Sequence, residues 1–324
     1  AREAQGHWVG IAANSHSGLG QGRDRVERLL RALQDRGLEG RVAWTPDERS
    51  ELVAEARAHS GCRCLVAAGG DGTVAALVNE RPEVPITVLK AGTENLFARH
   101  FGLSKRPLKL AATIATGRVV AMDLGQASGR RFSLMAGCGF DAEVVTRHHL
   151  SRIAGSGVAR PTHRGTYVEP VLSASISYKF PPLEITFDSG ETEETLVGTS
   201  AFLFNLPRYA LGLPFAPSAR GDDGWLDLVI FRNGGPWNAL RYLWLVLLGS
   251  HLREPGVHHR RVKRVTIACP EAAPVQLDGD PGGTLAADPS GALWTAEILP
   301  LALEVLVPAA FAGEGRWKRG TGHG

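Results

Sequence analysis

The sequence predicts an α/β domain with a parallel sheet at residues 1–121, followed by a mostly antiparallel β-sandwich domain at 122–299. In the first stretch, short apolar runs alternate with segments of helical periodicity, which is typical of parallel sheets. In the second, apolar runs follow one another with Gly, Pro and Asp between several of them, which is typical of antiparallel sheets. A last apolar run at 301–307 is expected to return to the first domain, within 300–312, and the polar residues 313–324 are expected to form a flexible tail.

The elements of the first domain follow from periodicity and glycine positions. Val26, Leu29 and Leu33 recur at helical spacing, and Gly37 closes that helix. The expected elements, in chain order, are a strand at 7–13, a helix at 23–36, a strand at 41–45, a helix at 50–59, a strand at 64–68, a helix from 74 to 79 and a strand at 86–89.

The second domain is expected to consist of strands without helices between them. The expected strands lie at 122–126, 131–136, 174–180, 183–188, 200–206, 226–232, 264–268 and 273–277. Residues 151–165, rich in Gly, Arg and His, are expected to form a loop or mobile segment. The longest apolar run, 239–248, contains an arginine and is shorter than the roughly 20 residues that cross a bilayer. A buried helix is the expected form, and an interfacial element that contacts lipid is the alternative.

Composition and charge exclude several classes of protein. Lys and Arg number 36 against 33 Asp and Glu, so the net charge of +3 is too small to indicate a nucleic-acid binder. The same small excess is compatible with an anionic membrane surface. The N-terminal residues carry no apolar signal segment, and the four cysteines show no zinc-site spacing. We therefore expect a cytoplasmic protein with reduced thiols and without a transmembrane segment, with peripheral membrane contact as a further option.

The turn from Gly69 to Thr73 carries the strongest chemical signal. Glycines after a buried strand (Gly69, Gly70 and Gly72) let the backbone approach a phosphate, and the N–H groups of the turn and the following helix would face that anion. Asp71 cannot attract phosphate directly, but it would suit a Mg²⁺ ion that bridges it to a nucleotide. The alternative is a tight strand-to-helix turn in which the aspartate caps a helix. The sequence has no G-x-x-x-x-G-K-[ST] motif, so it gives no support for a P-loop.

Two other polar turns close expected strands of the same sheet. One follows residue 13 and contains Asn14, Ser17 and Gly18; the other contains Gly92, Thr93 and Asn95. In a parallel sheet, ligands bind beyond the carboxyl ends of the strands, where all three turns are expected to meet. Each turn alone is also compatible with a purely structural role.

The second domain holds two acidic clusters. Asp222 and Asp223 are adjacent and could hold a structural cation or shape a turn. Asp278 and Asp280 are separated by one glycine, and a carboxylate of this kind could act as general base on a hydroxyl. From spacing alone, a turn explains this second cluster equally well.

These motifs, taken in order, resemble those of the diacylglycerol-kinase catalytic-domain family, which includes sphingosine and ceramide kinases and bacterial relatives. The matching segments are 69–73, 92–95 with 97–99 behind it, 136–142, 217–224 and 277–280, and the likeness extends from residue 14 to about 307. The resemblance implies the fold shared by NAD kinases and diacylglycerol kinases, with ATP bound between two domains.

The resemblance also implies roles for individual residues. Asp71 would act through Mg²⁺, Asp280 would be the general base with Asp278 assisting, and Asp222 with Asp223 would hold a structural Mg²⁺. The nucleotide would be lined by Asn14, Ser17, Gly18, Thr45, Gly69, Gly70, Gly72, Thr73, Gly92, Thr93 and Asn95.

Three positions depart from the family pattern. Asp280 is one methylene shorter than the usual glutamate, Leu96 stands where many relatives have an aspartate, and Lys90 stands where proline is common. The first departure moves the carboxylate by roughly an ångström, which could lower the rate sharply.

The sequence therefore predicts an ATP- and Mg²⁺-dependent kinase that phosphorylates a hydroxyl of diacylglycerol or a related lipid at a membrane surface, with a strand-edge homodimer as one option. Two alternatives are a nucleotide- or lipid-binding regulator with weak or no catalysis, and a kinase of a non-lipid hydroxyl. A nicotinamide-nucleotide kinase shares the G-G-D-G-T turn, but the Asn79-Glu80 pair lies too close to that turn to match its pattern.

Overall fold

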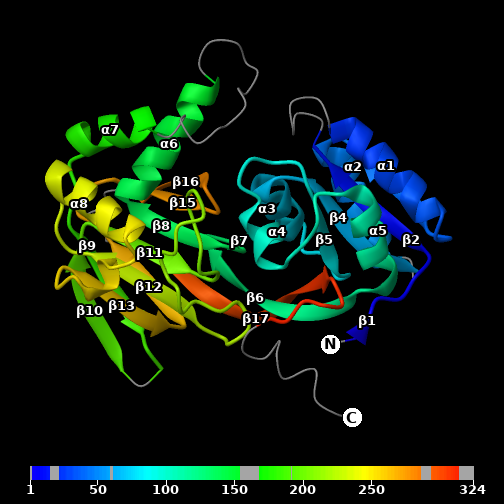
Figure 1. The fold of residues 1–324 in the computed structure, drawn as a ribbon. Helices are drawn as coiled ribbons and strands as arrows, with labels where there is room; N and C mark the ends of the chain where they lie inside the picture. The colour runs from blue at the N-terminus through cyan, green and yellow to red at the C-terminus, as the bar shows by residue number, and fades with distance from the viewer. Residues whose placement is uncertain are drawn as a thin grey trace. The chain divides into compact units, whose positions relative to one another are not determined.

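The computed structural model describes residues 2–14, 22–58, 61–153, 168–190, 192–285 and 293–313. The chain divides into two compact units (Figure 1). Unit 1 comprises 1–124 and 300–324, and unit 2 comprises 125–299.

Unit 1 is built on a parallel sheet whose strands alternate with helices. Neighbouring strands follow the order β17-β5-β4-β2-β3, and every pairing among them is parallel. Its elements are β1 (Arg2–Glu3), β2 (Trp8–Ala13), α1 (Gly22–Gln34), β3 (Glu39–Ala43), α2 (Pro46–Ala58), β4 (Cys62–Gly69), α3 (Asp71–Asn79), β5 (Ile86–Lys90), α4 (Leu96–His100), α5 (Pro107–Thr116), the first part of β6 (Arg118–Ala127) and the last part of β17 (Leu293–Val307).

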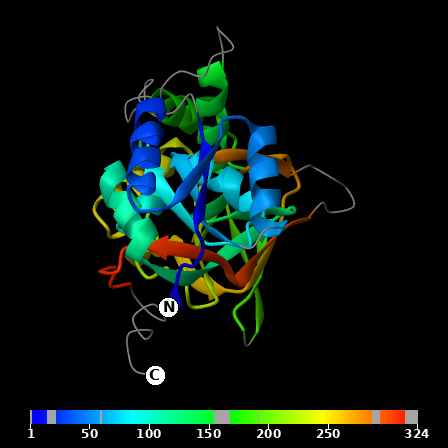
Figure 2. The same ribbon diagram turned by 90° about the vertical axis from the view of Figure 1, so that its right-hand side faces the viewer.

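Helices cover both faces of this sheet. The apolar stripe of α1 packs with α5 against β2 and β4, in a core that includes Leu29, Leu33, Ile11, Val66 and Leu110. The helices α2 and α3 pack against β2 and β4, and Figure 2 shows α1 and α2 on opposite sides of β2. The three central strands, β5, β4 and β2, are almost fully buried, as a parallel sheet covered on both faces requires.

Unit 2 contains two antiparallel sheets. One has the order β13-β12-β11-β8-β15-β16, and the other pairs β10, β9, β14 and the first part of β17. The elements are β7 (Arg130–Phe132), β8 (Met135–Gly139), α6 (Phe140–Ile153), α7 (Val168–Ser177), β9 (Leu183–Asp188), β10 (Glu193–Gly198), β11 (Ser200–Phe204), β12 (Leu226–Phe231), α8 (Pro236–Leu247), η2 (His251–Arg253), β13 (Val257–Val262), β14 (Arg264–Ala268), β15 (Ala273–Leu277) and β16 (Asp280–Leu285).

The two sheets of unit 2 share one apolar core. Alternate residues of β9, β11 and β14, among them Ile185, Phe187, Leu203, Val265 and Ile267, belong to the same buried cluster. Such inward alternation from two sheets defines a sandwich. The predicted fold class, an α/β domain with a parallel sheet followed by an antiparallel sandwich, is therefore confirmed.

The expectation that unit 2 lacks helices is wrong. The helices α6, α7 and α8 interrupt the strands, and residues 174–177, expected to be extended, end α7 instead. The sequence there alternates small and apolar residues over a run too short to distinguish period 2 from period 3.6. Of the expected loop at 151–165, residues 151–153 belong to α6, and the rest lie outside the described residues.

The apolar run at 239–248 is helical, as expected, but it is not buried. Within α8, only Tyr242 and Val246 are buried. The ring of Tyr242 packs on Phe231 with centroids 4.8 Å apart. Within the described part of the chain, no helix is both long and apolar enough to cross a membrane.

Candidate functional site

The predicted phosphate-binding turns lie at the carboxyl ends of adjacent strands. The N–H group of Asn14, after β2, donates to Ala68 O of β4 at 3.2 Å, and Ala91 N, after β5, donates to Gly69 O at 2.9 Å. The turns after β2, β4 and β5 therefore begin side by side. Asn14 is exposed, whereas Ser17 and Gly18 lie outside the described residues.

The two glycine turns after β4 and β5 pack directly on each other. A Cβ atom added to Gly92 would lie 2.4 Å from the Cα of Gly70, and one added to Gly70 would lie 3.0 Å from the Cα of Gly92. A Cβ atom at Gly69 would lie 2.0 Å from the hydroxyl oxygen of Thr73. These positions need glycine because of close backbone approach, and the contact brings the backbone of both turns to one place.

The Asp71 carboxylate holds the start of α4. Its two oxygens accept the N–H groups of Leu96 and Phe97, each at 3.0 Å. Helix capping, the alternative raised from the sequence, is thus real, but the helix is α4 rather than the helix that Asp71 itself begins. Burial raises the pKa of Asp71, while hydrogen bonds from the backbone N–H groups of Leu96 and Phe97 oppose that rise.

Asn95 shapes the second turn. It has a left-handed backbone with φ of 50°, a conformation that asparagine tolerates better than most residues. Its side chain accepts the N–H group of Gly92 at 3.0 Å and donates to Gly92 O. Leu96, the position where relatives often have aspartate, is buried and contributes its N–H group to Asp71.

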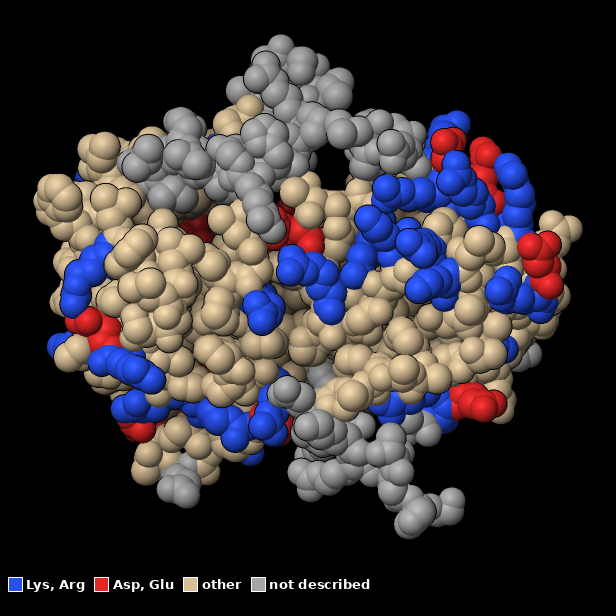
Figure 3. All heavy atoms as spheres, viewed as in Figure 1, with Lys and Arg blue, Asp and Glu red and all other residues tan. Residues whose placement is uncertain are grey.

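Cationic side chains surround this pair of turns. Burial lowers the pKa of Lys90, with the charge of Arg99 lowering it further and the charge of Asp71 raising it, so these groups interact. The Arg25 guanidinium donates to Lys90 O at 2.8 Å. Figure 3 shows Lys and Arg gathered over the side of unit 1 that carries α4 and α5. Together with the N-terminus of α3, these charges favour a bound polyanion.

Asp71 would suit a metal ion whose other ligands come from a bound nucleotide and water, rather than a metal ion coordinated by protein side chains alone. A carboxylate has about four acceptor positions, and the two N–H donors leave room for a cation. Among the described residues, no group of three or more His, Cys, Asp or Glu is arranged to hold a metal ion. Phosphate oxygens and water would have to complete the coordination, as is usual for Mg²⁺.

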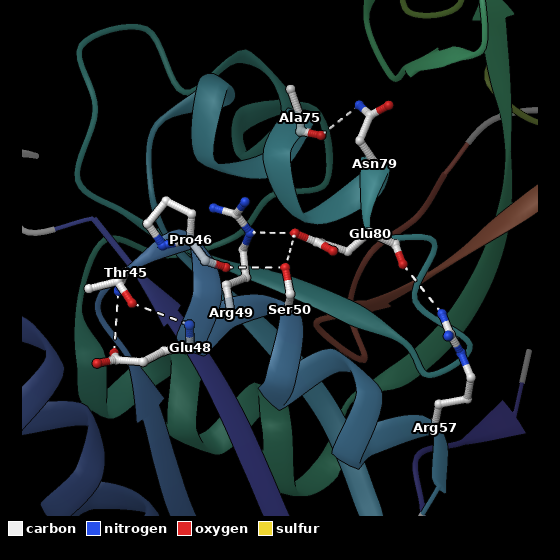
Figure 4. A network of polar contacts seen from close by, with 9 residues as sticks. All are labelled: Thr45, Pro46, Glu48, Arg49, Ser50, Arg57, Ala75, Asn79 and Glu80. Carbon is white, nitrogen blue, oxygen red and sulfur yellow. Dashed lines mark hydrogen bonds and ion pairs between the residues drawn. The ribbon is translucent and has the colours of Figure 1, made fainter.

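Thr45 is the N-cap of α2 (Figure 4). Its hydroxyl accepts the N–H group of Glu48 at 3.2 Å, and the Glu48 carboxylate accepts the N–H groups of Trp44 and Thr45, which makes a capping box. This geometry explains why α2 begins at Pro46, earlier than expected. Thr45 is exposed, and its structural role does not depend on a nucleotide.

Glu80, directly after α3, is bonded to α2, whereas the Asn79 side chain bonds back within α3 (Figure 4). The Asn79 side chain donates to Ala75 O, one turn back, at 2.8 Å. The Glu80 carboxylate accepts from Arg49 at 3.1 Å and from the Ser50 hydroxyl at 3.0 Å. These contacts give both residues a structural role.

Asp278 and Gly279 form the tight turn between β15 and β16, with φ of 52° and 85°. Asp-Gly is a favoured pair for such a turn. The buried Asp278 carboxylate accepts the N–H groups of Ser133, Leu134 and Met135 at 2.7–3.0 Å and the Ser133 hydroxyl at 3.0 Å. Burial raises its pKa to about 6. We infer that Asp278 organises this turn. The strand expected at 131–136 is interrupted at Ser133 and Leu134, between β7 and β8, where the backbone donates to Asp278. Asp280 is partly exposed at the start of β16.

Asp141, which was not among the expected site residues, is connected to this turn through Gln276. Gln276 donates to the Asp141 carboxylate at 2.9 Å and accepts the N–H group of Gly279 at 2.9 Å. Burial raises the pKa of Asp141 to about 6, opposed by hydrogen bonds from Gln276 and Tyr209. The signal that could have found it is its place directly after a glycine-rich strand end, at the N-terminus of α6.

Asp222 and Asp223 have different surroundings. Asp222 is fully buried, whereas Asp223 accepts the N–H group of Trp225 at 3.1 Å and forms an ion pair with Arg261. Asp227 is also buried, and one of its oxygens accepts from Ser218 at 2.8 Å and lies 2.6 Å from a His259 ring nitrogen. Its other oxygen has no hydrogen-bond partner within the described chain. Asp223 is already neutralised by Arg261, and the structural Mg²⁺ expected at Asp222 and Asp223 stays a prediction.

Two family models match the chain. The model described as diacylglycerol kinase catalytic domain matches residues 9–127. The model described as YegS C-terminal NAD kinase beta sandwich-like domain matches residues 136–307. These matches confirm the resemblance inferred from the sequence motifs.

Individual relatives match over most of their length. A protein of Mycobacterium tuberculosis named "Diacylglycerol kinase" is 29% identical over 311 residues, covering 93% of this chain and 95% of the relative. A protein of Pseudomonas aeruginosa named "Probable lipid kinase YegS-like" is 31% identical over 272 residues, covering 80% and 84%. A crystal structure of a diacylglycerol kinase from Bacillus anthracis superposes with a TM-score of 0.65 at 18% identity, covering 95% and 98%, and supports the fold.

Proposed function

Because the chain belongs to the diacylglycerol kinase catalytic-domain family, we propose that it transfers the γ-phosphoryl group of ATP to a hydroxyl of diacylglycerol or a related lipid, with Mg²⁺ as cofactor. The observation that carries the proposal is the direct packing of the Gly70 and Gly92 turns, together with the partly buried Asp71 carboxylate that holds the start of α4. Relatives named as diacylglycerol and lipid kinases support the class of acceptor.

The turns of unit 1 supply the phosphate site in this proposal. Glycine backbone at residues 69, 70, 72 and 92 lets N–H groups approach phosphate oxygens, and Thr73, Thr93 and Asn14 offer further polar groups. Lys90 and Arg99 add positive charge where charge develops during transfer. Mg²⁺, when bound beside Asp71, would neutralise phosphate charge. Positioning and electrostatics account for most of the acceleration in phosphoryl transfer, so no covalent intermediate is needed.

We assign the general-base role to Asp280. It begins β16, is partly exposed and stands at the family's glutamate position, whereas the Asp278 carboxylate is committed to four hydrogen bonds. Asp280 would take the proton of the acceptor hydroxyl as that oxygen attacks phosphorus. Asp278, with Gln276 and Asp141, would hold the turn that positions it.

An aromatic group in unit 2 suits an acyl chain. Phe140, Tyr178 and Phe180 lie together, with ring centroids 5.0–6.3 Å apart, at the N-terminus of α6 and after α7. Aromatic side chains offer large apolar contact area. An acyl chain that lay against these rings would gain apolar contact that a small polar acceptor would not.

The rival function is a regulator that binds nucleotide or lipid without turnover. Its support is that Leu96 and Asp280 differ from the residues usual at these positions in the family. However, Leu96 contributes through its backbone N–H group to Asp71, a role that any non-proline residue can fill. A homodimer through sheet edges remains a prediction.

An acceptor panel with radiolabelled ATP tests the proposal. The protein is incubated with [γ-³²P]ATP, Mg²⁺ and, separately, dioctanoylglycerol, sphingosine, a polyprenol or glycerol. Label in the dioctanoylglycerol product supports the proposal. Label only in glycerol would replace it with a non-lipid kinase, and ATP binding without any labelled product would favour the regulator.

A further inference from the structure

One face of α8 is apolar and exposed. Trp237 is 83% exposed, Trp244 61% and Leu248 61%, and Leu240 and Leu247 are exposed on the same helix. Positions 237, 240, 244, 247 and 248 recur at helical spacing, so they form one stripe. The opposite side anchors the helix through the buried Tyr242 and Val246. Monomeric proteins seldom leave an apolar stripe of this kind in water without a function for it.

The charges around this stripe favour an anionic partner. The segment 232–253 contains Arg232, Arg241 and Arg253 and no Asp or Glu. Arg241 forms an ion pair with Glu254, whereas Arg232 and Arg253 are exposed. Figure 3 shows a largely uncharged surface over α8 with basic side chains at its edge. Anionic lipid head groups attract basic residues that lie at the rim of such an apolar surface.

The length and composition of α8 suit a helix that lies in a membrane interface. Twelve residues span about 18 Å, too short to cross a bilayer. Tryptophan concentrates at membrane–water interfaces, and amphipathic helices with Trp and Leu on one side and Arg nearby bind there. Ile176, on α7, is 79% exposed, and α7 packs against α8, which adds apolar surface in the same part of unit 2.

We propose that the exposed face of α8 docks unit 2 onto the surface of an anionic lipid bilayer. Trp237 and Trp244 would insert at the boundary between the head groups and the acyl chains. The inference rests on the proposed function, because a diacylglycerol-like acceptor resides in the membrane and the enzyme must reach it there. Docking itself needs neither ATP nor turnover.

Vesicle binding tests the docking without catalysis. Wild-type protein is sedimented with vesicles of phosphatidylcholine alone and of phosphatidylcholine with phosphatidylglycerol, in the absence of ATP. The test variant carries Trp237→Gln and Trp244→Gln, and the control carries Val197→Gln, an exposed apolar residue of β10 in the same unit. We expect binding to the anionic vesicles to weaken by about tenfold or more in the double variant, equivalent to about 1.4 kcal/mol, and to stay unchanged in the control.

Three results would overturn the inference: no binding of the wild type, equal binding by the double variant, or a wild-type dimer that the double variant converts to monomer, which would assign the face to a second copy. Activity separates this failure from failure of the proposed function. On micromolar, water-soluble dihexanoylglycerol the double variant is expected to match the wild type, whereas on vesicle-borne diacylglycerol it is expected to be slower. Absence of turnover on both substrates in the wild type would refute the kinase assignment and leave the vesicle result standing.

Discussion

Replacing Gly92 by alanine tests the packing of the two glycine turns. The new Cβ atom would lie 2.4 Å from the Cα of Gly70 and 3.1 Å from its nitrogen. Ordinary contacts between carbon atoms are about 3.5–4.0 Å, so the turns would have to separate by about 1 Å. Overpacking of this size costs about 1–3 kcal/mol of stability. A displacement of about 1 Å at a catalytic site can cost about 10²-fold in rate.

The assay compares kcat/KM for ATP, with dioctanoylglycerol as acceptor, and the thermal midpoint of wild type and G92A. The matched control is Gly37→Ala, where φ is +71° and a Cβ atom would meet nothing within 4 Å. The control is expected to lose about 1 kcal/mol through backbone strain alone, with unchanged kcat/KM. We expect kcat/KM to fall about 10²-fold in G92A. If kcat/KM of G92A equals that of the wild type, the contact between Gly70 and Gly92 does not determine the geometry of the phosphate site.

Three further predictions concern carboxylates. Asp71→Asn, which offers one acceptor oxygen to two N–H groups, is expected to lose about 1–2 kcal/mol of stability and about 10²–10³-fold in kcat, measured by thermal melts and steady-state kinetics; unaltered kcat would contradict its catalytic role. Asp141 has a pKa raised from 3.8 to about 6, so its contribution to stability is present below the lower value and is lost as pH rises through the higher one. Asp141→Asn is therefore expected to be more stable than wild type above pH about 6, by about 1–3 kcal/mol, and equal to it below pH about 4 in urea titrations; a difference independent of pH would contradict this. Asp280→Asn is expected to lower kcat about 10²–10⁴-fold while Asp280→Glu retains or raises it, and equal activity of the two variants would exclude Asp280 as the base.

The fold of unit 1 could be predicted because its signals are local. Apolar periodicity placed α1, α2 and α3 and the buried strands β2, β4 and β5 within a few residues, and Gly37 marked the end of α1. The helices α4 and α5 were missed. In unit 2 the same reasoning missed α6, whose sequence from Asp141 to His149 is mostly polar, and misread the end of α7. The expectation that α8 is buried was also wrong, because an apolar sequence does not show which sides of a helix pack against the rest of the protein.

The site could be predicted only as a set of turns. That glycine and polar residues follow β2, β4 and β5 is visible in the sequence. The contact between Gly70 and Gly92, and the bonds from Asp71 to Leu96 and Phe97, depend on how neighbouring strands end, which no local pattern encodes. The same holds for Asp278, whose carboxylate organises residues more than a hundred positions earlier in the chain.

The most direct test of the account is formation of labelled phosphatidic acid from [γ-³²P]ATP and dioctanoylglycerol with Mg²⁺, measured side by side for the wild type and Asp71→Ala. We expect label in the lipid product of the wild type, and loss of that label in a variant that still melts cooperatively near the wild-type temperature. Equal labelling by the two proteins, or no labelled lipid from a wild type that binds ATP, would contradict the assignment of a lipid kinase that works through Asp71.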